Sequence, residues 1–303
     1  MFRKLLSLFC VLFLKLGSAQ DLTPVASYEF KEDSIYQKQL NLLITSYEQT
    51  KEILILDSIA QLSFRYKDWE TSMDFAKQAV DLQPNAQRYF LLGGAAGFRA
   101  LEVPMLSSLR YVNIMKPAFE KSVALEPDNV TYLRAQVDVL VALPSLLGGS
   151  VEEALQLIQK IKKQDLYEGL LAEGSLYEKK IENRDRAKEI YHQLFSKLNQ
   201  EFKSCSQAFI RELKNRRRNF SYDLARISAD FDLEEEWGLC ALSYFESSYL
   251  FRDTVPLAWV YYYQYIFAKK TGKEENAEIY FNKLENYKEV FPELLKQVNN
   301  TKL

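Results

Sequence analysis

The chain has 303 residues, of which 48% are hydrophobic, 14% aromatic and 26% charged, and its formal net charge is −2. This composition excludes a largely disordered chain, and the mildly acidic balance argues against a nucleic-acid-binding protein. Nearly every segment carries apolar residues at spacings of three and four, and none alternates with period two, so the sequence predicts an all-α protein.

The N-terminus has the pattern of a secretory signal peptide. Arg3 and Lys4 precede an apolar run over 5–14, and Gly17-Ser18-Ala19 supplies small residues for cleavage. The run is about ten residues long, whereas a membrane-spanning helix needs about twenty. We therefore expect residues 1–19 to be removed, leaving 20–303 as a single exported domain, periplasmic or secreted, with no stable membrane insertion.

The clearest structural signal lies between Tyr66 and Pro84. It reads as a turn, an amphipathic helix with small residues at Ser72 and Ala79, and a proline stop. A near-copy of its second half, Ala118-Phe-Glu-Lys-Ser-Val-Ala-Leu-Glu-Pro-Asp-Asn129, follows. Repetition of such a helix pair indicates a stacked solenoid.

The second unit is longer than the first. Pro84 and Pro127 lie 43 residues apart, against about 34 for the usual repeat of this kind. The excess falls at about 101–116, where we expect a lengthened second helix. Glycines in the stretch Leu91-Leu-Gly-Gly-Ala-Ala-Gly97 predict close approach by a neighbouring helix.

Four further units follow along the chain. They begin near Val130, with a helix capped by Ser150, near Leu166, near Phe220 and near Pro256. In the fourth unit, Ala187, Tyr191 and Phe195 are expected to face inward. The repeat signal fades at about 201–221, which contains the basic run Lys214-Asn-Arg-Arg-Arg218; we interpret this run and the acidic 232–236 as solvated helix ends.

The first unit resembles the tetratricopeptide repeat (TPR) family. Small residues at repeat positions 8, 20 and 27 and proline at position 32 fall on Ala60, Ser72, Ala79 and Pro84. In the last unit, Ala277 and Phe281 fit the pattern. The resemblance covers about two-thirds of the mature chain, which also resembles an exported bacterial subgroup of the family. The chain departs from the repeat pattern at Met115 and over 201–221. It implies a right-handed superhelical solenoid of about five to six antiparallel helix pairs.

Members of this family bind peptides or helices of partner proteins on the concave face formed by the first helix of each unit. The resemblance therefore implies a non-enzymatic scaffold for a protein or peptide partner of unknown identity. Carried over to this sequence, the groove positions are Asp57, Gln61, Phe64 and Arg65 in the first unit, Phe98 and Arg99 in the second, Arg134 and Asp138 in the third, and Tyr262, Lys269 and Lys270 in the last. Arginines beside aromatic residues suit capture of carboxylates and backbone groups.

The sequence offers little for catalysis. Its single histidine, His192, has no second ligand at metal-binding spacing, and we interpret it as a helix-surface or satisfied core residue. There is no Gly-x-Ser-x-Gly, no Gly-x-Gly-x-x-Gly and no phosphate-binding loop. We predict no catalytic residues, no metal and no cofactor.

Two alternatives remain open at this stage. Cys205 and Cys240 are an even pair in an exported chain and could close a loop of 35 residues. We favour two buried thiols, because both fall on segments expected to be helical, where side-chain direction is restrictive. The second alternative is a small-molecule binding protein with a pocket between the glycine-rich helix and the aromatic run Trp259 to Tyr265.

Overall fold

The computed structural model describes residues 26–300, and in that range it contains fifteen α-helices and no β-strand. The signal peptide expected over 1–19 lies outside the described residues. No helix in the described range is long and apolar enough to span a bilayer. The helices are α2 (Ser34–Thr50), α3 (Ile53–Arg65), α4 (Trp69–Leu82), α5 (Ala86–Glu102), α6 (Met105–Leu125), α7 (Val130–Ala142), α8 (Val151–Gln164), α9 (Leu166–Lys179), α10 (Arg184–Glu201), α11 (Gln207–Asn215), α12 (Phe220–Phe231), α13 (Glu235–Ser247), α14 (Leu257–Lys270), α15 (Glu274–Glu285) and α16 (Pro292–Asn300).

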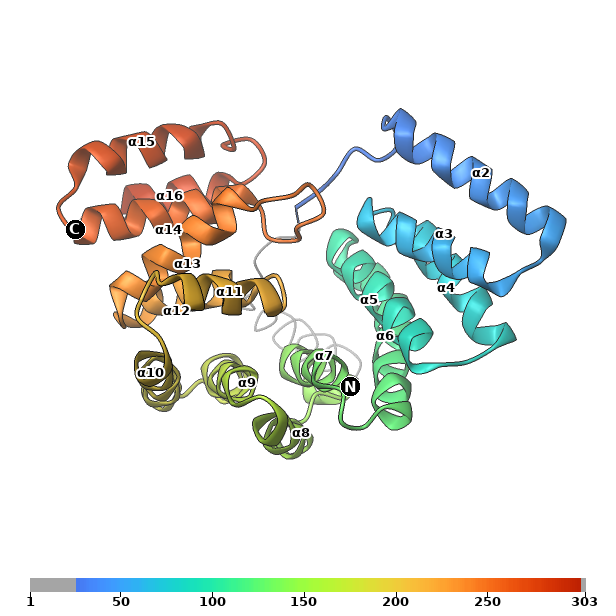
Figure 1. Cartoon of the computed structure of the whole chain (residues 1–303), viewed down its shortest axis with the longest axis horizontal. Helices are drawn as coiled ribbons and strands as arrows, with labels where there is room; N and C mark the ends of the chain where they lie inside the picture. The colour runs from blue at the N-terminus through green and yellow to red at the C-terminus, as the bar shows by residue number, and fades with distance from the viewer. Residues whose placement is uncertain (1–25, 301–303) are drawn as a thin grey trace, which may run out of the picture.

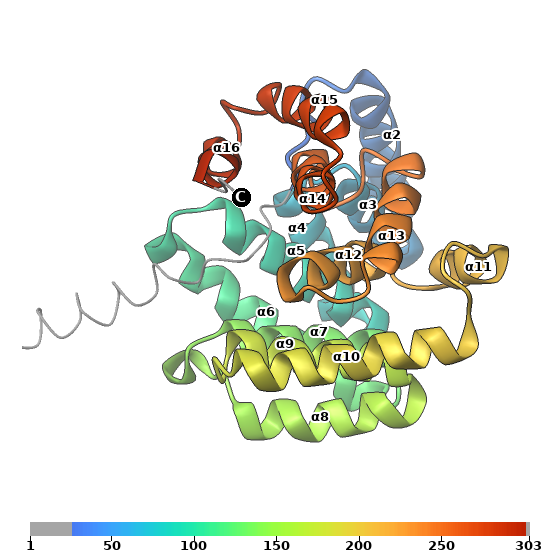
Figure 2. The ribbon, with the colours of Figure 1, turned by 90° about the vertical axis from the view of Figure 1, so that its left-hand side faces the viewer.

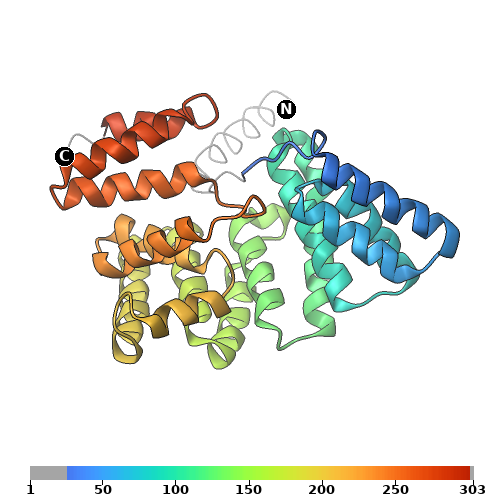
Figure 3. The same cartoon turned by 45° about the horizontal axis from the view of Figure 1, so that its top comes forward.

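Most of these helices pack as consecutive pairs, α3–α4, α5–α6, α7–α8, α9–α10, α12–α13 and α14–α15. The pairs coincide with the six units expected from the sequence, and the predicted all-α solenoid is confirmed (Figure 1). Helix α2 packs on α3 ahead of the first pair, and α16 packs on α14 and α15 at the other end. Figure 3 shows the pairs following one another around the molecule.

Local sequence explains where the helices begin and how the pairs close. The Ser150 hydroxyl accepts a hydrogen bond from the Glu153 amide at 3.2 Å, as its capping pattern predicts. Asp68 caps α4 in the same way through Thr71. Between α3 and α4, the Ser72 hydroxyl donates to the Ala60 carbonyl at 2.9 Å, so these small residues let the two backbones approach.

The glycines of helix α5 lie close to side chains of the neighbouring helices. A Cβ added at Gly93 would lie 3.0 Å from the Phe119 ring of α6, and one at Gly97 would lie 3.0 Å from the sulfur of Met115. The expected close approach is therefore confirmed. Helix α6 is lengthened to 21 residues, begins after Pro104 and contains Pro117 in its interior.

The solenoid curves until its first and fifth units meet (Figure 1). The contact is made by the connection 248–256 between α13 and α14, here called the closing loop. The Lys67 ammonium, in the turn between α3 and α4, donates to the Asp253 carbonyl at 2.8 Å. The Ala26 amide donates to the Thr254 carbonyl at 2.8 Å, and the Phe251 ring packs on the Tyr28 ring with centroids 4.8 Å apart.

The segment 201–221, where the repeat signal fades, contains the short helix α11. This helix lies at the edge of the molecule in Figure 2. Its apolar side chains are nevertheless buried in the core shared by α9, α10, α12 and α13, and the Phe209 ring meets the Trp237 ring edge-on at 4.6 Å. The extra helix thus fills the space between the fourth and fifth pairs.

A disulfide joins Cys205 to Cys240, with their Cα atoms 5.4 Å apart. The interpretation of two unlinked thiols is wrong in this structure. Its premise fails because only Cys240 lies on a helix, whereas Cys205 occupies the turn before α11 in the left-handed backbone region, with φ of 54°. A turn residue can direct its side chain where a helical residue could not.

The interpretation of the basic run 214–218 as a solvated helix end is wrong for its three arginines, whereas Lys214 and Asn215 are exposed at the end of α11. Arg216 pairs with Asp165 and with Glu212, and Arg217 pairs with Glu168. The third arginine, Arg218, forms a bidentate pair with Asp253 of the closing loop, at 2.9 and 2.7 Å. Apart from Glu212 of α11, these partners lie at the start of α9 and in the closing loop, far from the arginines in sequence.

Candidate functional site

Charged side chains gather on three first-of-pair helices in the middle of the solenoid. In Figure 1, α7 and α9 lie nearer the centre of the curve than α8. Together with α12, which presents Asp223, Arg226 and Asp230 at spacings of three and four, they bring cations and carboxylates together. We call this set the central charge cluster; it comprises Arg134, Asp138, Glu168, Glu178, Lys179, Arg217, Asp223, Arg226 and Asp230.

Helix α7 contributes the two residues of this cluster that the repeat pattern predicted. The Arg134 Nη2 lies 2.9 Å from Asp138 Oδ1, and its Nε donates to Oδ2 at 3.3 Å. Arg134 is only 9% exposed. Its Nη1 is buried and has no hydrogen-bond partner among the described residues.

Two further ion pairs connect α9 to α12 and the turn that precedes it. Arg217 Nε lies 2.9 and 2.8 Å from the two carboxylate oxygens of Glu168, and its Nη2 donates to Asp223 at 2.5 Å. Arg226 bonds both oxygens of Glu178 at 2.8 and 3.0 Å. These pairs connect the fourth and fifth units, which are separated in sequence by the segment 201–221.

The arginines of the cluster keep two of its buried carboxylates ionised. Burial alone would raise the pKa of Glu178, but the adjacent Arg226 holds that pKa below its usual range. The pKa of Asp223 is likewise lowered against burial, by Arg217, Arg134 and Arg226. Arg134 of α7 is thus one of three arginines whose charge favours the ionised Asp223 carboxylate of α12.

Lys179, like Asp138, is a member of the cluster that is open to solvent. Its side chain is exposed, yet burial by the surrounding protein lowers its pKa, and the nearby charge of Arg226 lowers it further. Glu178, Asp223 and Asp138 oppose that shift.

The groove residues predicted in the first two units divide into two groups. Asp57 forms a bidentate ion pair with Arg88 of α5, both contacts at 2.8 Å, and so joins the first unit to the second. Gln61 and Arg65 are exposed on α3. The remaining three, Phe64, Phe98 and Arg99, come together around Trp69; the Trp69 ring stacks on Phe98 at 4.6 Å and meets Phe64 edge-on at 5.1 Å.

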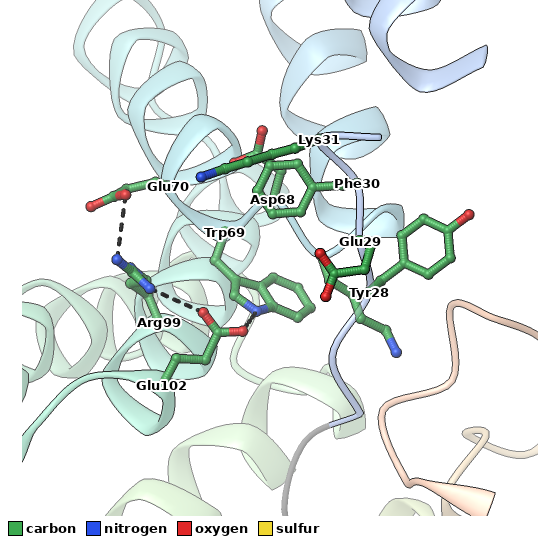
Figure 4. A pocket seen from close by; sticks show the side chains of 10 residues that line it. Tyr28, Glu29, Phe30, Lys31, Asp68, Trp69, Glu70, Arg99 and Glu102 are labelled. Carbon is green, nitrogen blue, oxygen red and sulfur yellow. Dashed lines mark hydrogen bonds and ion pairs between the residues drawn. The ribbon is translucent and has the colours of Figure 1, made fainter. Parts of the chain in front are cut away.

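Arg99 and Trp69 line a cavity of about 300 Å³ beside the N-terminal segment (Figure 4). The Trp69 indole donates to Glu102 at 2.7 Å, and Arg99 lies between Glu102, at 3.1 Å, and Glu70, at 3.5 Å. Arg99 Nε is buried without a partner among the described residues. The full lining consists of Tyr28, Glu29, Phe30, Lys31, Lys67, Asp68, Trp69, Glu70, Arg99 and Glu102.

In the last unit the predicted groove residues contact other residues of this chain. The Tyr262 ring meets the rings of Trp259, at 6.1 Å, and Tyr263, at 5.1 Å. Lys269 pairs with Glu274 at 2.8 Å. Lys270 donates to the Ala229 carbonyl at 2.7 Å and pairs with Asp232. These lysines connect the ends of neighbouring helices.

The residues expected to line the alternative small-molecule pocket pack against other side chains in the structure. The glycines of α5 face Phe119, Met115 and Phe64, whose side chains occupy that space. The run Trp259 to Tyr265 packs into the cores formed with α12, α13, α15 and α16. His192 is exposed on α10.

Sequence reasoning missed Lys179 and the three charged residues of α12. A signal for α12 was present, because Asp223, Arg226 and Asp230 recur at helical spacing on an otherwise apolar helix. Lys179 carried no such signal, because it sits among charged residues at a helix end and resembles any solvated lysine.

Comparisons with known proteins support the fold. No protein-family sequence profile matches the chain, and no curated protein matches it. Among solved structures, the chain is similar to a tetratricopeptide repeat protein from Parabacteroides merdae ATCC 43184, with a TM-score of 0.52 and 14% sequence identity. The match covers 88% of this chain and 94% of the other. The structure therefore has a TPR-like fold.

Proposed function

We propose that this chain is an exported, non-enzymatic scaffold that binds a partner polypeptide on its concave face. The observation that carries the proposal is the central charge cluster, where Lys179 and Asp138 remain open to solvent in the middle of the solenoid. Solenoids of stacked helix pairs bind partners along such extended curved surfaces. Exposed charges of both signs on this surface favour steering and orientation of a polar partner.

Capture of the partner tests the proposal. Residues 20–303 would be expressed with an affinity tag in the native host, crosslinked, and analysed for co-purifying proteins by mass spectrometry. We expect a partner that is lost from Lys179→Glu and Asp138→Lys baits. A Lys197→Glu bait is the matched control, because Lys197 is exposed on α10 and bonds only Gln200. Equal capture by all baits would contradict binding on the concave face.

Export rests on the sequence pattern of residues 1–19 and has its own test. Cell fractionation with N-terminal sequencing of the recovered protein should find a chain that begins at Gln20 outside the cytoplasm. A cytoplasmic chain that retains Met1 would contradict export without affecting the binding proposal.

A second function, binding of a small molecule, is favoured by the cavity of about 300 Å³ beside Trp69. That volume is at the lower end of the range for ligand sites. Native mass spectrometry of protein purified from the host would detect a retained ligand. A ligand that is lost from an Arg99→Met variant would support this function.

A further inference from the structure

The meeting of the first and fifth units is made by loops. Extensive packing between helices of the described range joins only helices that are neighbours along the chain or have one helix between them. The closing contact lies outside this packing, because it joins the α3–α4 turn and the N-terminal segment 26–33 to the closing loop (Figure 1). Small interfaces between parts of one chain permit relative movement.

Hydrogen bonds cross this interface to two backbone carbonyls of the closing loop. The Lys67 ammonium donates to the Asp253 carbonyl at 2.8 Å. The Ala26 amide donates to the Thr254 carbonyl at 2.8 Å. Lys67 is 3% exposed, and the Asp253 carboxylate is occupied by Arg218, so the buried ammonium meets a neutral acceptor. An ammonium buried in this way is destabilised relative to water, and separation of the loop relieves that cost.

An aromatic contact also crosses the interface. The Phe251 ring of the closing loop has its centroid 4.8 Å from the ring of Tyr28 and 5.0 Å from the ring of Tyr66. Phe251 is 41% exposed, so its ring binds at the surface of the first unit and not in a core. Such a ring is detached without exposing the interior of either unit.

Each side of the interface is held by contacts of its own. In the fifth unit, Arg218 donates to both oxygens of the Asp253 carboxylate, at 2.9 and 2.7 Å. The Leu250 amide donates to the same carboxylate at 2.8 Å. On the opposite side, the Tyr28 hydroxyl donates to Asp33 at 2.7 Å. Separation of the two sides therefore leaves these internal contacts in place.

From these contacts we propose that the closing contact is a clasp that releases as a unit. The closing loop separates from the α3–α4 turn and from the N-terminal segment, while both sides keep their own structure. The solenoid then opens between its first and fifth units, and the curvature of its concave face changes. The clasp is a property of this chain alone and does not rest on the binding of a partner.

Protonation of Lys67 opposes closure. Burial lowers its pKa to about 8 in the closed form, against 10.5 for a lysine in water, so the closed form gains as the pH rises between these values. The ratio of closed to open molecules should then rise about twentyfold from pH 7.5 to 9.5. The charged and titratable groups around Lys67 are Asp253 of the closing loop with its partner Arg218, Tyr28, Glu29 and Lys31 of the N-terminal segment, Asp68 and Glu70 beside the turn, and Arg99 and Glu102 of α5.

Single-molecule FRET measures the opening. Leu54 of α3 and Ile279 of α15 are replaced by p-acetylphenylalanine in the 20–303 protein, and dyes are attached there, which leaves the Cys205–Cys240 disulfide unmodified. The two positions are 68% and 52% exposed, so the labels do not disturb a core. Leu42 of α2, which is 62% exposed, forms the control pair with Leu54 at one end of the solenoid.

We expect a closed and an open population, with a closed-to-open ratio that rises with pH in wild type and not in Lys67→Met. Phe251→Ser should lower this ratio about fivefold or more, because both aromatic contacts are lost. Leu250→Ser is the matched control, since Leu250 is 45% exposed in the same loop. A constant distance in the control pair and an unchanged circular dichroism spectrum distinguish opening from unfolding.

A single population that neither pH nor Phe251→Ser alters overturns the clasp. Equal shifts in Phe251→Ser and Leu250→Ser overturn it as well, because the aromatic contact would then have no specific effect. A distance change shared by the control pair indicates unfolding and also counts against a clasp. Because opening is measured in the isolated protein, none of these results depends on the capture of a partner.

Discussion

The Lys67 ammonium donates a hydrogen bond to the backbone carbonyl of Asp253 at 2.8 Å, across a sequence separation of 186 residues. Lys67 is 3% exposed and Asp253 is 4% exposed. The Asp253 carboxylate simultaneously receives Arg218, so one residue connects the first unit, the closing loop and the start of α12. Through this contact the solenoid is closed, and its concave face is held at a fixed curvature.

The closing contact predicts an unusual dependence of stability on pH. Burial lowers the pKa of Lys67 from 10.5 to about 8. Between those values the unfolded chain binds more protons than the folded one, so the free energy of unfolding rises with pH. From pH 7.5 to 9.5 we expect a rise of about 2 kcal/mol from this group. Urea titrations of wild type and Lys67→Met should show that only wild type has this rise.

Lys51→Met is the matched control for that experiment. Lys51 is exposed and has φ of 57°, close to the 62° of Lys67, so the substitution meets the same backbone conformation without breaking the closing contact. Hydrogen exchange of amides in the closing loop should accelerate in Lys67→Met and not in Lys51→Met. Equal exchange in both variants would mean that Lys67 does not hold the loop.

Removal of one partner of the Glu178–Arg226 pair should lower the free energy of unfolding substantially. Their side chains are 8% and 10% exposed, so Arg226→Met leaves a buried carboxylate without its partner. We expect a loss of about 3–5 kcal/mol, and recovery of most of it in the double variant Arg226→Met/Glu178→Leu. Denaturant unfolding measures both, and a double variant less stable than the single one would contradict the assignment.

The same pair sets a response to acid. Because Arg226 holds the folded pKa of Glu178 below its ordinary 4.5, its stabilisation is present above about pH 4.5 and is lost as pH falls through the folded value. Thermal melts between pH 6 and pH 3 should show a shallower fall in Glu178→Gln than in wild type. Parallel curves would show that Glu178 is not a source of the acid sensitivity.

Gly174 of α9 should tolerate no side chain. A Cβ there would lie 2.1 Å from the ring of Tyr191, which is fully buried in α10. Gly174→Ala should therefore cost at least the 1–3 kcal/mol that is typical of overpacking. Gly94→Ala is the control, because its Cβ would lie 3.2 Å from the Phe64 ring and alanine favours the helix by about 0.5–1 kcal/mol. Similar melting temperatures for the two variants would contradict the α9–α10 packing.

Overpacking also tests the helix pair that the sequence identified first. Ala79 is fully buried in α4, so Ala79→Phe should destabilise the protein by about 1–3 kcal/mol. Gln78→Phe, at an exposed position of the same helix, should have little effect on the thermal melt. An unchanged melt for Ala79→Phe would count against the assignment of α3 and α4 as a repeat.

The disulfide predicts a loss of stability on reduction. Cys205 and Cys240 are separated by 35 residues, and closing a loop of that size stabilises by roughly 3–4 kcal/mol in the chain-entropy model. The Cys205→Ser/Cys240→Ser variant should lose about this amount in urea unfolding, and a reductant should have no further effect on it. Mass spectrometry of the unreduced protein would contradict the linkage if both thiols reacted with iodoacetamide.

Much of the fold could be predicted from local patterns. The boundaries near Pro84, Pro127 and Ser150 follow from proline stops and capping residues, whose effects extend over only one turn of helix. The inward stripe of Ala187, Tyr191 and Phe195 follows from helical periodicity, and all three are fully buried. The candidate site was predicted less completely: Arg134 and Asp138 came from the repeat pattern, whereas Lys179 did not.

The helix pairs follow from local sequence, because side-chain spacing, caps and small residues act between positions close along the chain. Which charges face one another depends instead on how the units are arranged in space. Arg216, Arg217 and Arg218 are adjacent in sequence, yet the first two pair with Asp165 and Glu168 at the start of α9 and the third pairs with Asp253 of the closing loop. Such partners depend on how the units curve in space, and that curvature is fixed by contacts such as Lys67 with Asp253, which no local pattern encodes.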